Sequence, residues 1–166
     1  MTESVLDALT HPIVQAPMGG GPGAPALATA VSRAGGLGFL AAGYKTPDAV
    51  RGEIDEVRAG LPNQAPFGVN VFAPPGRRAD PAVVAAYADT LRDEATRLEV
   101  ELGNPRWDDD HYADKLELLA AERVAVVSFT FGCPSRSDVS RLQDAGSAVW
   151  VTVTTVDEAR AAQAAG

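Results

Sequence analysis

The stretch FGVNVFAPP at residues 67–75 decides the fold class, because its first six residues are almost continuously apolar and a proline pair ends the run. Four other runs share this apolar character: residues 13–16, 36–41, 124–129 and 148–153. Continuous apolar runs, as opposed to alternating ones, are typical of strands covered on both faces, as in parallel sheets. We therefore predict five strands in these five ranges.

Helical start and stop signals lie between the predicted strands. Side chains that can cap a helix stand before four helical stretches, at Thr46, Asp80, Ser135 and Thr155. A proline follows directly after the first two of them. Ser135 with Asp138, and Thr155 with Glu158, have the spacing of capping boxes. Glycines that suit a left-handed C′ position follow alanine-rich ends at Gly35, Gly146 and Gly166. Alternating strands and helices predict an α/β fold with a parallel sheet in one domain, residues 1–166.

The longest connection lies between the third and fourth predicted strands. Its apolar residues follow helical spacing and predict one helix from Asp80 to near Gly103: Val84, Tyr87, Leu91, Ala95, Leu98 and Leu102. Asn104-Pro105 predicts a break, and residues 110–121 a second helix. We interpret the run Asp108–Asp110 as a helix cap and solvated turn, not as a metal site.

Two architectures fit this pattern, a doubly wound open sheet and a (β/α)₈ TIM barrel. A dinucleotide-binding loop with the spacing G-x-G-x-x-G would place its last glycine at Ala24, and no acid for ribose follows the second strand at residues 41–44. The glycines of residues 19–23 are then interpreted as a tight turn. We predict the barrel, here its first five βα units. Polar strand-end residues such as Asn70, Ser128 and Thr152 are candidate ligand contacts, because a buried amide or hydroxyl needs a partner.

Composition excludes several classes of function. The chain has 166 residues and a formal net charge of −8, which gives no electrostatic reason to bind nucleic acid or anionic lipid. No apolar stretch approaches the roughly 18 residues of a membrane span, and the N-terminus has no export signal. The single cysteine suits a reducing compartment, so we expect a cytoplasmic protein. We interpret Cys133 as a small semi-buried residue, not as a nucleophile.

Four segments together resemble the nitronate monooxygenase family, formerly called 2-nitropropane dioxygenase: PIVQAPMGG at 12–20, AGGLGFLAAG at 34–43, FGVNVFAP at 67–74 and VVSFTFGCP at 126–134. The resemblance continues through VTVTTVDEARAAQAAG at 151–166. It implies an FMN-dependent monooxygenase, an oxidoreductase in which the flavin takes reducing equivalents from an alkyl nitronate and dioxygen reoxidises it. The products would be a carbonyl compound and nitrite.

The resemblance also implies the cofactor contacts. Ala16, Pro17, Met18 and Gly19 would line the isoalloxazine ring, largely through backbone atoms. Asn70 would hydrogen-bond the flavin or its ribityl chain, and Ser128 and Thr152 would lie nearby. Packing against the barrel top remains an equal interpretation of Met18. For Asn70 we favour the ligand contact over plain burial.

This sequence departs from the family in three places. The family's catalytic histidine lies in an AGGH segment after a further strand, beyond Gly166; neither His11 nor His111 follows a strand directly. The loops that hold the FMN phosphate, after strands seven and eight, would also lie beyond this chain. Thr130 stands where many members carry histidine, a difference that bears on substrate preference.

We therefore expect the sequence to be the N-terminal portion of a longer chain, because a closed barrel needs about 250 residues. The fragment alone should be inactive and should not hold FMN. Two alternatives remain, another FMN barrel such as an enoyl-ACP reductase, which would use NADPH, and a non-catalytic partial barrel that self-associates. The expected partners are a small nitronate and dioxygen, and homo-oligomerisation stays open.

Overall fold

The computed structural model describes residues 4–62 and 65–166. The N-terminus was predicted to have no export signal, and its residues 1–3 lie outside the described residues. The chain divides into two compact units, one running to Pro74 and resuming at Asp110–Gly166, the other Pro75–Asp109. Among the described residues, no helix has the length and apolarity needed to span a membrane.

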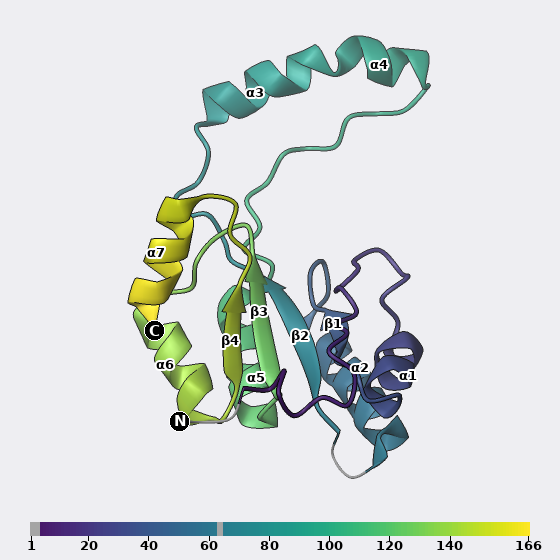
Figure 1. Cartoon of the computed structure of the whole chain (residues 1–166). Coiled ribbons are helices and arrows are strands. Elements are labelled where there is room, and N and C mark those ends of the chain that lie inside the picture. The colour runs from purple at the N-terminus through teal and green to yellow at the C-terminus, as the bar shows by residue number, and fades with distance from the viewer. Residues whose placement is uncertain (1–3, 63–64) are drawn as a thin grey trace. The chain divides into compact units, whose positions relative to one another are not determined.

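The first unit is built on a parallel four-stranded sheet with the strands in chain order (Figure 1). The strands are β1 (Gly38–Ala41), β2 (Phe67–Phe72), β3 (Val126–Thr130) and β4 (Ala148–Val151). Its helices are α1 (Pro25–Arg33), α2 (Pro47–Gly60), α5 (Tyr112–Glu122), α6 (Arg136–Asp144) and α7 (Val156–Ala165). The predicted parallel α/β class is confirmed, as are four of the five predicted strands.

The remaining prediction, a first strand at residues 13–16, is wrong. This segment forms an isolated parallel bridge from Val14 to Leu37, in line with β1. The Leu37 N–H donates to the Ile13 carbonyl over 2.9 Å, and the Gln15 N–H donates to the Leu37 carbonyl over 3.0 Å. Pairing stops there because the Gln15 side-chain oxygen, not a backbone carbonyl, accepts the Phe39 N–H over 3.0 Å.

The predicted caps are largely confirmed. Thr46, Ser135 and Thr155 each accept a backbone N–H at the start of α2, α6 and α7. Thr155 and Glu158 form both halves of a capping box. Ser135 forms one half, because the Asp138 carboxylate instead accepts from the Ser135 hydroxyl over 2.7 Å.

The predicted turn glycines also adopt the conformations that glycine favours. Gly35 and Gly146 have φ of 90° and 98° after α1 and α6, and Gly166 has φ of 155°. Gly20 and Gly21 have φ of 79° and 122° in the turn before α1, which supports the interpretation of those glycines as a tight turn.

The two faces of the sheet are covered differently. Leu40, Val69 and Phe129 belong to the larger apolar cluster, together with side chains of α1, α2, α5 and α6. The opposite face carries a smaller cluster of Leu37, Phe39 and Val126, against which Val5, Leu9, Ala148 and Trp150 pack. Strands covered on both faces were expected. Within the described residues, helices cover one face of the sheet, and only the smaller cluster covers the other.

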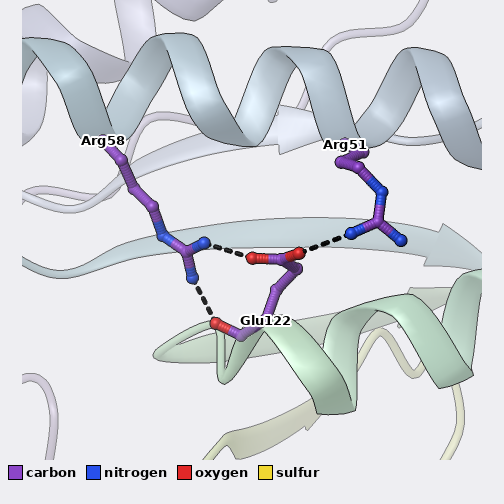
Figure 2. Close-up of polar contacts among 3 residues, drawn as sticks. All are labelled: Arg51, Arg58 and Glu122. Carbon is purple, nitrogen blue, oxygen red and sulfur yellow. Dashed lines mark hydrogen bonds and ion pairs between the residues drawn. The ribbon is translucent and has the colours of Figure 1, made fainter.

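An ion-pair cluster ties α2 to the end of α5. Arg51 and Arg58, both on α2, point toward the Glu122 carboxylate from either side (Figure 2). The Arg51–Glu122 distance is 2.8 Å, and Arg58 also donates to the Glu122 backbone carbonyl. Because both arginines come from one helix and Glu122 from another, the cluster adds a polar contact to the apolar packing between α2 and α5.

The second unit contains α3 (Pro81–Thr90) and α4 (Arg92–Arg97), so the prediction of one helix to near Gly103 is wrong. The Thr90 hydroxyl donates to the Tyr87 carbonyl over 2.6 Å, a bond that competes with helix continuation. Glu99, with φ of 54°, follows the end of α4. Of the predicted apolar stripe only Ala95 is buried. The cap prediction at Asp80 is confirmed, since its carboxylate accepts the Ala82 N–H over 2.8 Å.

Candidate functional site

Strand register brings four residues into one row across the sheet. Ala41 is paired with Asn70, Asn70 with Ser128, and Ser128 with Trp150. Residues two positions apart share a face of a strand, so Phe39, Phe72 and Thr130 lie on the same face as this row. This is the face opposite to the large helix-packed cluster.

A cavity of about 500 Å³ opens on that face. Its lining is mixed, with polar side chains among aromatic and small apolar ones: Val14, Ala16, Pro17, Gly19, Phe39, Ala41, Asn70, Phe72, Ser128, Thr130, Trp150, Val151 and Thr152. Six of the seven predicted cofactor contacts therefore meet in one cavity. Met18 is the exception: it is 36% exposed and does not line this cavity.

Asn70 is held in one orientation at the centre of the cavity wall. Its side chain is 4% exposed, and Nδ2 donates to Ser128 Oγ over 3.0 Å and to Thr130 Oγ1 over 2.9 Å. The Thr130 hydroxyl also lies 3.0 Å from Asn70 Oδ1. The buried amide thus has partners within the protein, so its burial alone does not require a ligand. Its contact with a cofactor stays a prediction.

Sequence reasoning missed the aromatic part of the lining. Phe39 and Trp150 lie with ring centroids 5.8 Å apart, and Phe72 forms another part of the wall. Each was assigned to an apolar strand and nothing more. One signal could have found them. Side chains two positions apart in a strand point to the same face, so Phe39 shares a face with Ala41, and Trp150 with Thr152.

None of the residues lining this cavity is ionisable near neutral pH. His11 lies in the segment before the Val14 bridge, and His111 is the N-cap of α5, so the prediction that neither directly follows a strand is confirmed. Over residues 4–62 and 65–166, no three His, Cys, Asp or Glu side chains are grouped so that they could hold a metal ion.

The prediction of a helix cap within Asp108–Asp110 is wrong, whereas Asp108 and Asp109 are exposed, as expected for a solvated segment. The N-cap of α5 is His111, with φ of 53° and no side-chain cap bond. Asp110 instead lies 2.8 Å from the ammonium of Lys115, whose side chain is fully buried. The other carboxylate oxygen of Asp110 accepts the Tyr44 N–H over 2.8 Å. The acidic run therefore ends in a largely buried ion pair that reaches the loop after β1.

Two further polar groups, the Cys133 thiol and the Tyr112 hydroxyl, lie near α6. Cys133 is exposed, so the expectation of a semi-buried residue is wrong. The Tyr112 hydroxyl donates to the Asp138 carboxylate over 3.3 Å. Burial, and then the negative charge of Asp138, raise the pKa of the Tyr112 hydroxyl well above its ordinary value.

A second cavity of about 430 Å³ lies beside the first residue of β2, with Arg58, Phe67, Glu122 and Arg123 in its wall. This is the amino end of the sheet. In parallel α/β folds, ligand sites lie at the carboxyl ends of the strands. Arg58 and Glu122 moreover already pair with each other (Figure 2). The cavity beside Asn70 is therefore the candidate site.

Comparison with protein families gives one match that spans nearly the whole sequence. The profile described as nitronate monooxygenase matches residues 3–166. A nitronate monooxygenase of Pseudomonas aeruginosa is 41% identical over 162 residues, which are 95% of this chain and 45% of that protein. A probable nitronate monooxygenase of Bacillus subtilis is 38% identical over 91% of this chain and 43% of its own length. The chain thus spans less than half the length of these relatives.

Solved structures give a similar result. A nitroalkane oxidase from Streptomyces ansochromogenes superposes with a TM-score of 0.87 and 50% identity, over 98% of this chain and 46% of that one. FabK from Thermotoga maritima, as an M276A mutant, superposes with a TM-score of 0.68 and 30% identity, over 98% of this chain and 42% of that one.

Proposed function

The chain belongs to the nitronate monooxygenase family, and on that premise we propose that the whole protein oxidises alkyl nitronates with dioxygen, using bound FMN. The products would be a carbonyl compound and nitrite. The observation that carries the proposal is the row Ala41–Asn70–Ser128–Trp150, which forms the wall of one cavity together with residues 16, 17 and 19.

The fold that we propose for the whole protein is a TIM barrel of which this chain is the first part. Strands in simple chain order, all parallel, with helices on one face, support a barrel. A doubly wound sheet would reverse its strand order and carry helices on both faces. The bridge at Val14 takes the place of the first barrel strand.

The cavity has the chemistry that a flavin ring needs. Phe39 and Trp150 supply flat apolar surface, and Asn70, Ser128 and Thr130 supply donors and acceptors along one side. A Cβ added to Gly19 would meet nothing within 4 Å, so the chain has open space where a ring would approach the backbone. We propose that Ala16, Pro17, Gly19 and Asn70 would contact the ring, with Ser128 and Thr152 beside it.

When bound, the flavin would supply the oxidation of the nitronate and the reaction with dioxygen. The residues of this chain would bind and orient the flavin, and they would exclude water from it. Ser128 and Thr130 hold the Asn70 amide so that it needs no reorientation as a ligand arrives. Phe39 and Trp150 reduce the water beside the reacting face.

We propose that the base and the phosphate-binding loops are supplied by the rest of the protein. The cavity wall described above contains no group that could take a proton near neutral pH. The relatives are more than twice as long as the matched region, which supports a contribution from further sequence. The prediction of a cytoplasmic protein stays untested.

The test is an assay of the full-length protein with ethyl nitronate. We expect oxygen uptake and nitrite release without NADPH, together with the absorbance of a bound flavin. Activity that requires NADPH and releases no nitrite would instead support the alternative, a flavin-dependent reductase such as an enoyl-ACP reductase. The 166-residue chain expressed alone serves as a control, and we expect it to be colourless and inactive.

A further inference from the structure

Three aromatic side chains gather just beyond the carboxyl ends of the strands. Tyr44 follows β1, Phe72 ends β2 and Phe131 follows β3. The Phe72 ring lies edge-on to both neighbours, with centroids 5.2 Å from Tyr44 and 4.9 Å from Phe131. Tyr44 is 83% exposed and Phe131 74% exposed. Large aromatic side chains left open to solvent in mutual contact are typical of binding surfaces.

The backbone at both exposed residues is strained. Tyr44 has φ of 64° and Phe131 has φ of 70°, in the left-handed region. This region costs an ordinary residue about 1–2 kcal/mol, and bulky side chains rarely adopt it. Such strain persists where the surrounding structure enforces it, and it clusters at ligand-binding positions.

A buried ion pair enforces the conformation of Tyr44. Asp110 accepts the Tyr44 N–H over 2.8 Å through one carboxylate oxygen, and the other lies 2.8 Å from Lys115 Nζ. Because the Lys115 side chain is fully buried, its ammonium needs this carboxylate, and the carboxylate is held in place. The arrangement therefore holds the Tyr44 backbone in its left-handed conformation at the end of β1.

The aromatic residues are continuous with the candidate site. Phe72 lines the cavity beside Asn70 and also contacts both other rings. A Cβ on Gly43 would lie 2.3 Å from the Phe72 ring, so this glycine leaves the ring the space it occupies. A molecule that fills the cavity as far as Phe72 therefore meets Tyr44 and Phe131 at the cavity's edge. These three side chains are uncharged at neutral pH and recognise apolar groups.

We propose that Tyr44, Phe72 and Phe131 form an apolar substrate subsite that selects nitronates carrying a longer alkyl chain or an aryl group. Asp110 and Lys115 act as positioning residues for Tyr44. This inference rests on the proposed function, because it names the substrate class of the same site. The nitronate group would face the flavin, and its apolar substituent would contact the aromatic residues.

The test uses the full-length flavin-loaded protein and three probes: the nitronates of nitroethane, 1-nitrohexane and phenylnitromethane. The variants are Tyr44→Ala and Phe131→Ala, with Tyr44→Phe as the conservative variant and Tyr87→Ala as a matched exposed tyrosine of the second unit. The first readout is the ratio of kcat/KM for the hexyl and phenyl probes over the ethyl probe. The second is the Kd of neutral 1-nitrohexane and nitroethane, from the change in absorbance of the bound flavin.

We expect the wild type to prefer the hexyl and phenyl probes, and each alanine variant to lose about tenfold of that preference in both readouts. Tyr44→Phe and Tyr87→Ala should keep it. An unchanged preference in both alanine variants would overturn the subsite, as would a wild type without preference. A change in molar mass by light scattering, with preference intact, would show instead that the aromatic residues join two copies of the protein.

The two proposals fail in different ways. If the wild type holds flavin but oxidises none of the three nitronates, the proposed function is wrong. The Kd comparison still decides the subsite in that case. If nitronates are oxidised and neither readout responds to Tyr44 or Phe131, the function stands and the subsite is wrong.

Discussion

The side-chain nitrogen of Asn70 in β2 lies 2.9 Å from the hydroxyl oxygen of Thr130 in β3. Thr130 occupies the last position of β3, where it is paired with Phe72, two residues beyond Ser128 on the same face of the strand. The Ser128 backbone carbonyl, which can only accept, lies 3.3 Å from the same nitrogen, so the carbonyl and the two hydroxyls together hold the Asn70 amide with its nitrogen toward β3. The relationship makes Thr130 a positioning residue for Asn70.

Thr130→Val should loosen that orientation while keeping the shape of the side chain. We expect a loss of stability of about 1 kcal/mol, because one hydrogen bond to a buried amide is removed. Flavin affinity of the full-length apoprotein should fall several-fold, because an amide held only from Ser128 is less well ordered before the flavin binds. Fluorescence titration with FMN measures it. Thr130→Ser keeps the hydroxyl and is the control, and equal FMN affinities for the two variants would contradict this role.

Asp110 and Lys115 should show strong coupling in a double-mutant cycle. Asp110→Ala leaves a fully buried ammonium without its carboxylate and should cost about 3 kcal/mol of unfolding free energy. Adding Lys115→Met should recover much of that loss, because no buried charge remains. Urea denaturation measures all four proteins. Simple additivity of the two single changes would show that the pair does not interact.

The strands were predictable from sequence because they are short apolar runs with clear ends. Residues 67–72 form β2 as predicted, and β1, β3 and β4 lie within three residues of the expected bounds. The first strand was not predictable in the same way. Its apolar run is real, but the Gln15 side chain intercepts the next ladder bond, a long-range contact that local pattern does not encode.

The candidate site was predictable where a single residue was chemically out of place. Asn70 stands out as an amide in an apolar strand, and the structure places it in the cavity wall, while its contact with a cofactor stays a prediction. Trp150 and Phe39 do not stand out, because aromatic residues are ordinary in strands. The contact between Tyr44 and Asp110 joins positions far apart in sequence, so only the folded chain reveals it.

Two glycines should respond to alanine with opposite signs. A Cβ on Gly43 would lie 2.3 Å from the Phe72 ring, so Gly43→Ala should push that ring and cost about 1–3 kcal/mol. Gly52 lies inside α2, and a Cβ there meets nothing within 4 Å. Gly52→Ala should therefore stabilise the protein, by up to about 1 kcal/mol. Thermal unfolding followed by circular dichroism compares them, and two shifts of the same sign would contradict the assigned packing.

Tyr112 should make the protein's stability fall at alkaline pH. Burial and the Asp138 charge raise the pKa of its hydroxyl above the value of about 10 that it has in the unfolded chain. Above that pH the unfolded chain has lost the proton while the folded chain keeps it, so the folded state binds more protons. The contribution of the Tyr112 hydroxyl to the free energy of unfolding is therefore fully present below about pH 10. It declines as the pH rises from there toward the pKa of the folded state.

Tyr112→Phe removes the titrating group and keeps the ring against Phe129, whose centroid lies 6.3 Å away. At pH 7 the variant should be less stable by about 1 kcal/mol or less, the value of the lost bond to Asp138. Above about pH 10 its stability should fall less steeply than that of the wild type, so the difference narrows. Urea denaturation from pH 7 to 11, with both proteins in a Cys133→Ser background, follows the two curves. Parallel curves across the whole range would show that Tyr112 ionises as it does in the unfolded chain.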